Sequence, residues 1–107
     1  MLEKITHLND LFDCYEPLLT NKQRELFKLY YQHDYSLGEI AEQSDVSRQA
    51  VYDTLKRVTS LLYDYESKLK LLAKEQLIEK TINDMEDILT TDDDIRLREI
   101  YKNLIKS

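Results

Sequence analysis

The chain of 107 residues has only one glycine and one proline, the residues that most often interrupt helices, and only one cysteine, the residue that forms disulfides. Because glycine and proline punctuate a chain, their scarcity predicts long helices joined by few tight turns. A lone cysteine, Cys14, cannot form an internal disulfide, so a reducing, cytoplasmic setting is the simplest expectation. The longest apolar runs span two or three residues, so we expect neither a membrane-spanning segment nor a signal-peptide core.

The patterns that enzymes and metal sites require are missing as well. A loop that cradles phosphates needs several glycines, whereas Gly38 is alone. The two histidines, His7 and His33, are too far apart for a metal-ligand spacing. The acidic triplet Asp92–Asp94 lacks the glycine of a calcium loop, and we interpret it as the first turn of a helix. We therefore expect no enzyme, no cofactor and no metal site.

The first segment, residues 2–16, has the spacing of an amphipathic helix. Its apolar face consists of Ile5, Leu8, Phe12 and Tyr15. Pro17 should end this helix near Tyr15 or Glu16, because proline removes a helical hydrogen bond and clashes with the preceding turn.

Two capping boxes mark the starts of the next two helices. Thr20 is followed by Gln23, and Ser36 is followed by Glu39. In such a pair, each side chain accepts a hydrogen bond from a backbone amide that the first turn leaves free. The helix from Ser36 should end near Gln43. The helix from Thr20 should bury an apolar face made of Leu26, Phe27, Leu29, Tyr30 and Tyr31.

A long helix should follow from Ser47. Its apolar residues alternate spacings of four and three, a heptad pattern made of Val51, Leu55, Val58, Leu62, Tyr65, Leu69 and Leu72. The pattern fails after Leu72, so we expect a bend or a break near residues 73–76. Apolar positions then resume on a shifted phase, and a last helix should span residues 92–105.

Residues 36–57 have the features of a helix-turn-helix. The motif needs a small residue where its two helices touch, and Ala41 occupies that position. Ser47 caps the second helix, whose first turn would face the bases of a nucleic acid. Most such turns contain glycine where this chain has Asp45, a residue that also tolerates a left-handed backbone. The alternative is a plain αα-hairpin with a capped second helix.

The outward side of this second helix predicts a nucleic-acid-binding surface. Arginine suits guanine, glutamine suits adenine, and lysine suits phosphate. The side chains expected there, which we call the polar tip, are Arg48, Gln49, Tyr52, Lys56 and Arg57, with Asp53 among them.

The segment LLTNKQRELFKLYYQHDYSLGEIAEQSDVSRQAVYDTLKR, residues 18–57, resembles the YlxM-like family of small bacterial proteins. The opening LNDLFDCYEPLLT and the continuation YDYESKL are similar to the same family, so the resemblance covers residues 1–72 well. More distantly, this half resembles the promoter-reading helix-turn-helix of sigma factors. The resemblance implies a wholly helical fold. It also implies a regulatory role linked to the signal recognition particle, because family members are typically encoded beside that particle's GTPase.

These observations predict an all-α protein in two parts. A helix-turn-helix domain, with a three- to four-helix core of winged-helix-like or sigma-region type, should occupy residues 1–72. A helical arm, built from long C-terminal helices, should occupy residues 73–107.

The formal net charge of −6 opposes binding to a polyanion. The acid excess is heaviest in residues 73–107, with 9 acidic and 6 basic side chains. Within residues 47–58, three cations at Arg48, Lys56 and Arg57 oppose only Asp53. Three phosphate contacts would give a log–log salt slope of only about −2.7. A monomer should therefore bind nucleic acid weakly.

The sequence leaves two functions open. The first is a regulator that binds DNA or RNA through the polar tip. The second is an interaction module that uses the helix-turn-helix scaffold to bind a basic protein or a ribonucleoprotein, such as a signal recognition particle component, without reading nucleic acid. No membrane partner is expected. The end of the heptad pattern, Leu62 to Leu72, favours a homodimer, and folding back of the C-terminal helices is the alternative.

Overall fold

The computed structural model describes residues 2–88, 99–100 and 102–104. Its helices are α1 (Leu2–Tyr15), the 3-10 helix η1 (Glu16–Leu18), α2 (Asn21–Phe27), the π-helix η2 (Lys28–Gln32), α3 (Leu37–Ser44), α4 (Arg48–Leu69) and α5 (Leu71–Ile88). The described residues contain no strand, which confirms the all-α fold. The helix predicted for residues 92–105 lies mostly outside the described residues, and the triplet Asp92–Asp94 lies entirely outside them.

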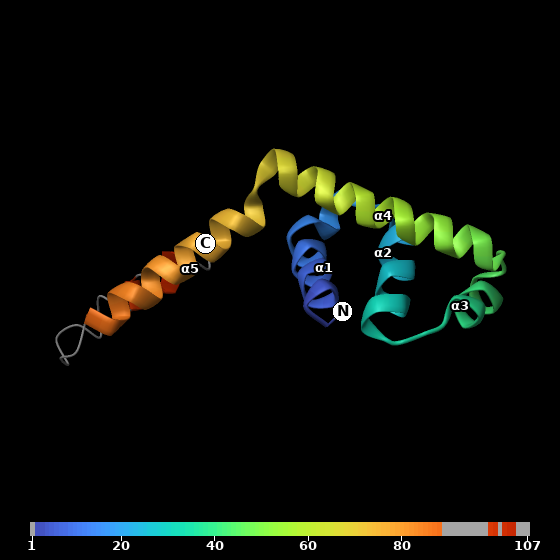
Figure 1. Cartoon of the computed structure of the whole chain (residues 1–107), viewed down its shortest axis with the longest axis horizontal. Coiled ribbons are helices and arrows are strands. Elements are labelled where there is room, and N and C mark those ends of the chain that lie inside the picture. Colours follow the sequence, from blue (N-terminus) through green and yellow to red (C-terminus); the bar gives the residue numbers. More distant parts are fainter. Residues whose placement is uncertain (1, 89–98, 101, 105–107) are drawn as a thin grey trace. The chain divides into compact units, whose positions relative to one another are not determined.

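The chain forms two compact units, Met1–Leu69 and Lys70–Ser107. In the first unit, α4 forms one side, and α1, α2 and α3 all pack against it (Figure 1). The second unit contains α5. None of the described helices is both long and apolar enough to cross a membrane.

The helix ends of the first unit follow the local sequence signals. α1 ends at Tyr15, two residues before Pro17, as predicted. The first capping box forms, because the Thr20 hydroxyl accepts from the Gln23 amide at 3.2 Å and the Gln23 side chain accepts from the Thr20 amide at 3.0 Å. These two bonds satisfy amides that the start of α2 would otherwise leave free.

The second capping box forms at the start of α3. The Ser36 hydroxyl accepts from the Glu39 amide at 3.1 Å, and the Glu39 carboxylate accepts from the Ser36 amide at 3.0 Å. The bond from the Ser36 amide holds the pKa of the Glu39 carboxyl below its ordinary value. Because the pKa is lower in the folded protein, this cap stabilises the fold above the ordinary carboxyl pKa. That stabilisation is lost as the pH falls through the folded value.

A stack of two phenylalanine rings joins α1 to α2. The rings of Phe12 and Phe27 lie 4.3 Å apart at an interplanar angle of 9°, and Tyr31 tilts against Phe27 at 4.7 Å. Around this stack lies the core of the first unit, whose largest fully buried side chains also include Leu8, Leu11, Tyr15, Leu26, Ile40, Val51, Val58 and Leu62. Fully burying such side chains contributes roughly 1.5–3 kcal/mol each.

Two predicted core residues lie at the surface instead. Ile5, on the predicted apolar face of α1, is 38% exposed. Leu11, which is not part of that predicted face, is fully buried in the core. Tyr30 is 36% exposed because η2 is a π-helix, in which the His33 amide donates to the Lys28 carbonyl five residues back. The wider turn rotates the following side chains. Consequently Tyr31, rather than Tyr30, packs against the core.

The long helix ends earlier than the heptad pattern predicts. α4 stops at Leu69, and the break falls at Lys70, which has a left-handed backbone with φ of 55°, rather than at residues 73–76. The heptad face is covered within the first unit as far as Tyr65, whose ring lies 5.8 Å from that of Tyr15. The Tyr15 hydroxyl also donates to the Glu66 carboxylate at 2.6 Å. Leu62 is therefore part of the core, not of a projecting extension.

Candidate nucleic-acid interface

The turn between α3 and α4 has the geometry that a helix-turn-helix requires. Asp45 caps α3 in the left-handed region, with φ of 55° and ψ of 45°, so it fills the position that glycine usually takes. The Val46 amide then donates to the Ala41 carbonyl at 3.1 Å. Ala41 is buried in one cluster with Val51 of α4, as its predicted role at the helix contact requires. The small side chain lets α3 approach α4 closely.

Ser47 caps α4, as predicted. Its hydroxyl accepts from the Ala50 amide at 3.0 Å, and its carbonyl accepts from the Val51 amide at 3.1 Å. The inward side of the helix is set by Val51 and Leu55, which are both buried. Because these two residues fix the rotation of α4, the remaining positions of its first turns must face outward.

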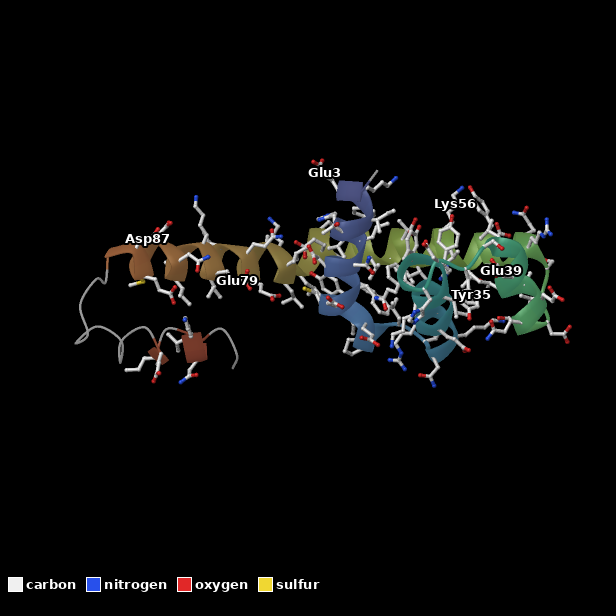
Figure 2. All side chains as sticks on the ribbon, turned by 90° about the horizontal axis from the view of Figure 1, so that it is seen from below. Glu3, Tyr35, Glu39, Lys56, Glu79 and Asp87 are labelled. Atoms are coloured by element: carbon white, nitrogen blue, oxygen red, sulfur yellow. The ribbon has the colours of Figure 1, made fainter. Side chains whose placement is uncertain are left out.

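All five residues of the polar tip are exposed on this outward side of α4. Tyr52 is 48% exposed, and Lys56 projects away from the helix (Figure 2). Residues 48, 52 and 56 are spaced by four and therefore share one face, whereas Arg57 lies at its edge. The Gln49 amide group donates to the Asp53 carboxylate at 2.9 Å, so these two side chains are paired with each other in this structure.

The position of Arg48 depends on Gly38, a relation that the sequence alone did not indicate. A Cβ atom placed on Gly38 would lie 3.0 Å from Nη2 of Arg48. The guanidinium group therefore lies across the first turn of α3, in contact with the only glycine of the chain. A side chain at residue 38 would push this group aside.

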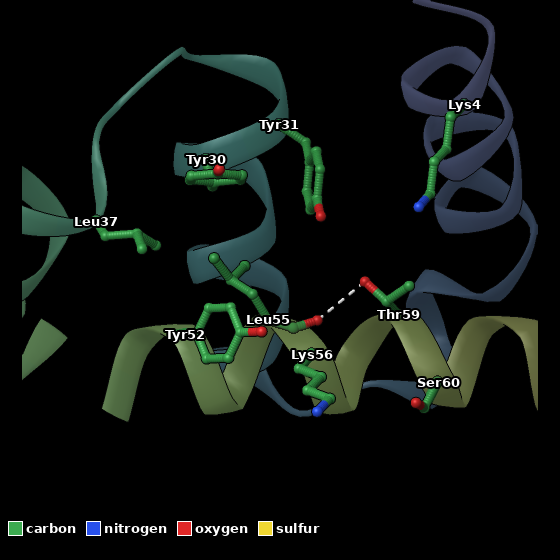
Figure 3. Close-up of a pocket in the computed structure, with 9 residues that line it drawn as sticks. All are labelled: Lys4, Tyr30, Tyr31, Leu37, Tyr52, Leu55, Lys56, Thr59 and Ser60. Carbon is green, nitrogen blue, oxygen red and sulfur yellow. Dashed lines mark hydrogen bonds between the residues drawn. The ribbon is translucent and has the colours of Figure 1, made fainter. Parts of the chain in front are cut away.

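A groove lies beside the polar tip, between α4 and the elements α1, η2 and α3 (Figure 3). Its volume is about 390 Å³. We call it the tyrosine groove and define it by six of its lining residues, Lys4, Tyr30, Tyr31, Tyr52, Lys56 and Thr59. Only Tyr52 and Lys56 belong to the polar tip, and α1 and η2 contribute residues from distant parts of the sequence. Across residues 2–88, 99–100 and 102–104, no group of three or more acidic, histidine or cysteine side chains could hold a metal ion.

Comparison with known proteins identifies relatives along nearly the whole chain. Residues 2–104 match the family UPF0122, described as "Putative helix-turn-helix protein, YlxM / p13 like". UPF0122 proteins of Bacillus mycoides (strain KBAB4) and Bacillus thuringiensis (strain Al Hakam) are each 50% identical to the chain over 95 residues. Each alignment covers 89% of this chain and 86% of the relative. The family is described by its helix-turn-helix and not by an enzymatic activity.

Proposed function

The chain belongs to the UPF0122 family of YlxM/p13-like helix-turn-helix proteins, and from this premise we propose that it is a regulatory protein that binds DNA or RNA. The binding surface is the polar tip of α4. The protein acts as a regulator and not as an enzyme, and it acts in the cytoplasm. The resemblance to the YlxM-like family supports a role in the signal recognition particle pathway.

One observation carries the proposal. The first turns of α4 are capped by Ser47, held against α3 through the turn at Asp45, and expose the three cations of the polar tip on the side away from the core. In a helix-turn-helix, this is the part of the second helix that enters the major groove and contacts base edges. Arginine and lysine at such positions neutralise phosphates or bind guanine.

Alanine substitution tests the proposal. Arg48→Ala and Lys56→Ala should each weaken binding to duplex DNA or structured RNA by roughly tenfold or more, because a hydrogen bond to a charged group is worth about 1.5–3 kcal/mol. Both side chains are exposed, so the thermal midpoint should stay nearly unchanged. Gel retardation at low salt measures the first effect and circular dichroism the second. Lys22→Ala, an exposed lysine on α2, is the matched control. Absence of retardation of either nucleic acid by the unaltered protein would contradict the proposal.

We also propose that the protein binds nucleic acid as a homodimer. Three large apolar side chains of α5 are exposed, namely Leu71, Leu77 and Ile78. Pairing of two copies through this region would bury them and would double the basic contacts, which are few in one copy.

Sedimentation at micromolar concentration checks the dimer. The unaltered chain should sediment as a dimer, and Leu77→Glu should shift it to a monomer, because this side chain is 65% exposed in one chain and a buried carboxylate would be costly. Gln76→Glu adds the same charge at an exposed residue on another face of α5 and serves as the control. If the unaltered chain sediments only as a monomer, and Leu77→Glu sediments in the same way, the dimer proposal is wrong.

A second candidate function rests on the composition of α5. Its exposed apolar residues lie among acidic side chains, of which Glu79 and Asp87 project from the helix in Figure 2. An acidic amphipathic helix suits a basic protein or a ribonucleoprotein, such as a signal recognition particle component. A protein that remains monomeric and fails to retard nucleic acid, but is recovered with a basic partner after nuclease treatment, would favour this function.

A further inference from the structure

We propose that the tyrosine groove binds one unpaired nucleotide of a nucleic-acid strand, with the base against the tyrosines and the phosphate near Lys4. This inference rests on the proposed function, because it names the part of a nucleic acid that the protein holds beside the polar tip. The groove shares Tyr52 and Lys56 with the tip and extends it towards α1 and η2. A strand that lies along the tip therefore passes the opening of the groove.

The size of the groove favours a single nucleotide. Small-molecule sites have volumes of roughly 300–1,000 Å³, and the groove has about 390 Å³. A base that is paired and stacked inside a duplex cannot enter a space of this size without leaving its stack. An unpaired base in a loop, a bulge or a single strand can enter without that cost.

The aromatic walls of the groove provide surfaces for stacking. Tyr30 lies on η2 and is 36% exposed, and its ring stands nearly perpendicular to that of Tyr31, with the centroids 4.9 Å apart. Tyr52 lies on α4 across the groove (Figure 3). Proteins commonly hold unpaired bases by stacking them on exposed aromatic rings, and this contact is tolerant of base identity. The π-helix that turns Tyr30 out of the core is therefore what makes this surface available.

The charge of the groove favours an anionic ligand. Lys4 and Lys56 line it, and no carboxylate does so among the described residues, although the formal net charge of the chain is −6. Figure 3 shows Lys4 extending from α1 towards α4. The Thr59 hydroxyl already donates to the Leu55 carbonyl at 3.0 Å, so its oxygen is left as an acceptor that suits an amino group of a base.

Tyr30→Ala tests the groove without touching the polar tip. Binding of a short single-stranded oligonucleotide to the full chain, followed by fluorescence anisotropy at low salt, should weaken by roughly 5- to 150-fold, which corresponds to the ~1–3 kcal/mol lost when one stacking residue is removed. Tyr30→Phe keeps the stacking face and should bind like the unaltered protein. Tyr35→Ala is the matched control, because Tyr35 is 37% exposed but does not line the groove. Adenosine monophosphate is added as a competitor. If it displaces the oligonucleotide, the groove binds free nucleotides as well as nucleotides within a strand.

The outcomes separate the groove from the tip. If Tyr30→Ala, folded by circular dichroism, binds the single strand as tightly as Tyr35→Ala does, the inference is overturned. The proposed function still stands in that case if a blunt-ended duplex is bound in a manner that depends on Arg48 and Lys56. Conversely, the protein could bind the single strand in a manner that depends on Tyr30 and bind no duplex. That result would support nucleotide binding in the tyrosine groove and contradict duplex binding by the polar tip.

Discussion

Phe27→Ala is expected to destabilise the first unit by about 3–5 kcal/mol, the usual cost of deleting a buried phenylalanine ring. The side chain is fully buried, and it lies between the ring of Phe12 and the ring of Tyr31. Removal of Phe27 therefore leaves a cavity at the only phenylalanine stack of the chain, where α1 meets α2. Small domains are stable by only about 5–15 kcal/mol. The variant should lose most of its stability margin.

Urea titration followed by far-ultraviolet circular dichroism measures this loss. Phe27→Leu should lie between the unaltered protein and Phe27→Ala, because it removes less volume. Tyr35→Ala removes an exposed aromatic side chain and should change the free energy of unfolding by no more than about 0.5 kcal/mol. Equal midpoints for Phe27→Ala and Tyr35→Ala would mean that the stack does not hold α1 and α2 together.

The elements that the sequence predicts well are those fixed by local chemistry. The capping boxes at Thr20 and Ser36 depend on bonds between residues three apart, and the end of α1 depends on Pro17. The inward face of α4 depends on a regular spacing that begins at Val51. In each case the cause and the effect lie within one or two turns of the same helix.

The elements that the sequence does not predict depend on contacts between distant residues or on unusual backbone geometry. Lys70 takes a left-handed conformation that lysine does not favour, so nothing in its identity marks the break between α4 and α5. The π-helix after Phe27 changes which tyrosine faces the core. The candidate site shows the same division. The exposed face of the polar tip follows from the spacing along α4, whereas the contact of Arg48 with Gly38 requires the folded turn.

Reversal of two charges at the polar tip is expected to have the largest effect on function. Lys56→Glu combined with Arg57→Glu removes two of its three cations and places two carboxylates near the phosphates. Loss of two charged hydrogen bonds alone costs about 3 kcal/mol or more, so affinity for duplex DNA or structured RNA should fall at least about a hundredfold. Because the salt slope is proportional to the number of phosphates neutralised, it should fall to about a third of its original value. That ratio is the same for a monomer and for a dimer.

A second double variant distinguishes the effect of the added negative charge from the effect of its position at the polar tip. Lys22→Glu combined with Lys74→Glu alters the net charge of the chain by the same amount, on exposed residues of α2 and α5. General repulsion of a more acidic protein would weaken binding equally in both double variants, and it is screened by salt. Specific phosphate contacts at the tip would leave the salt slope of the α2/α5 variant unchanged. Titrations of each double variant at several salt concentrations therefore decide the matter, and equal slopes would show that Lys56 and Arg57 do not contact phosphate.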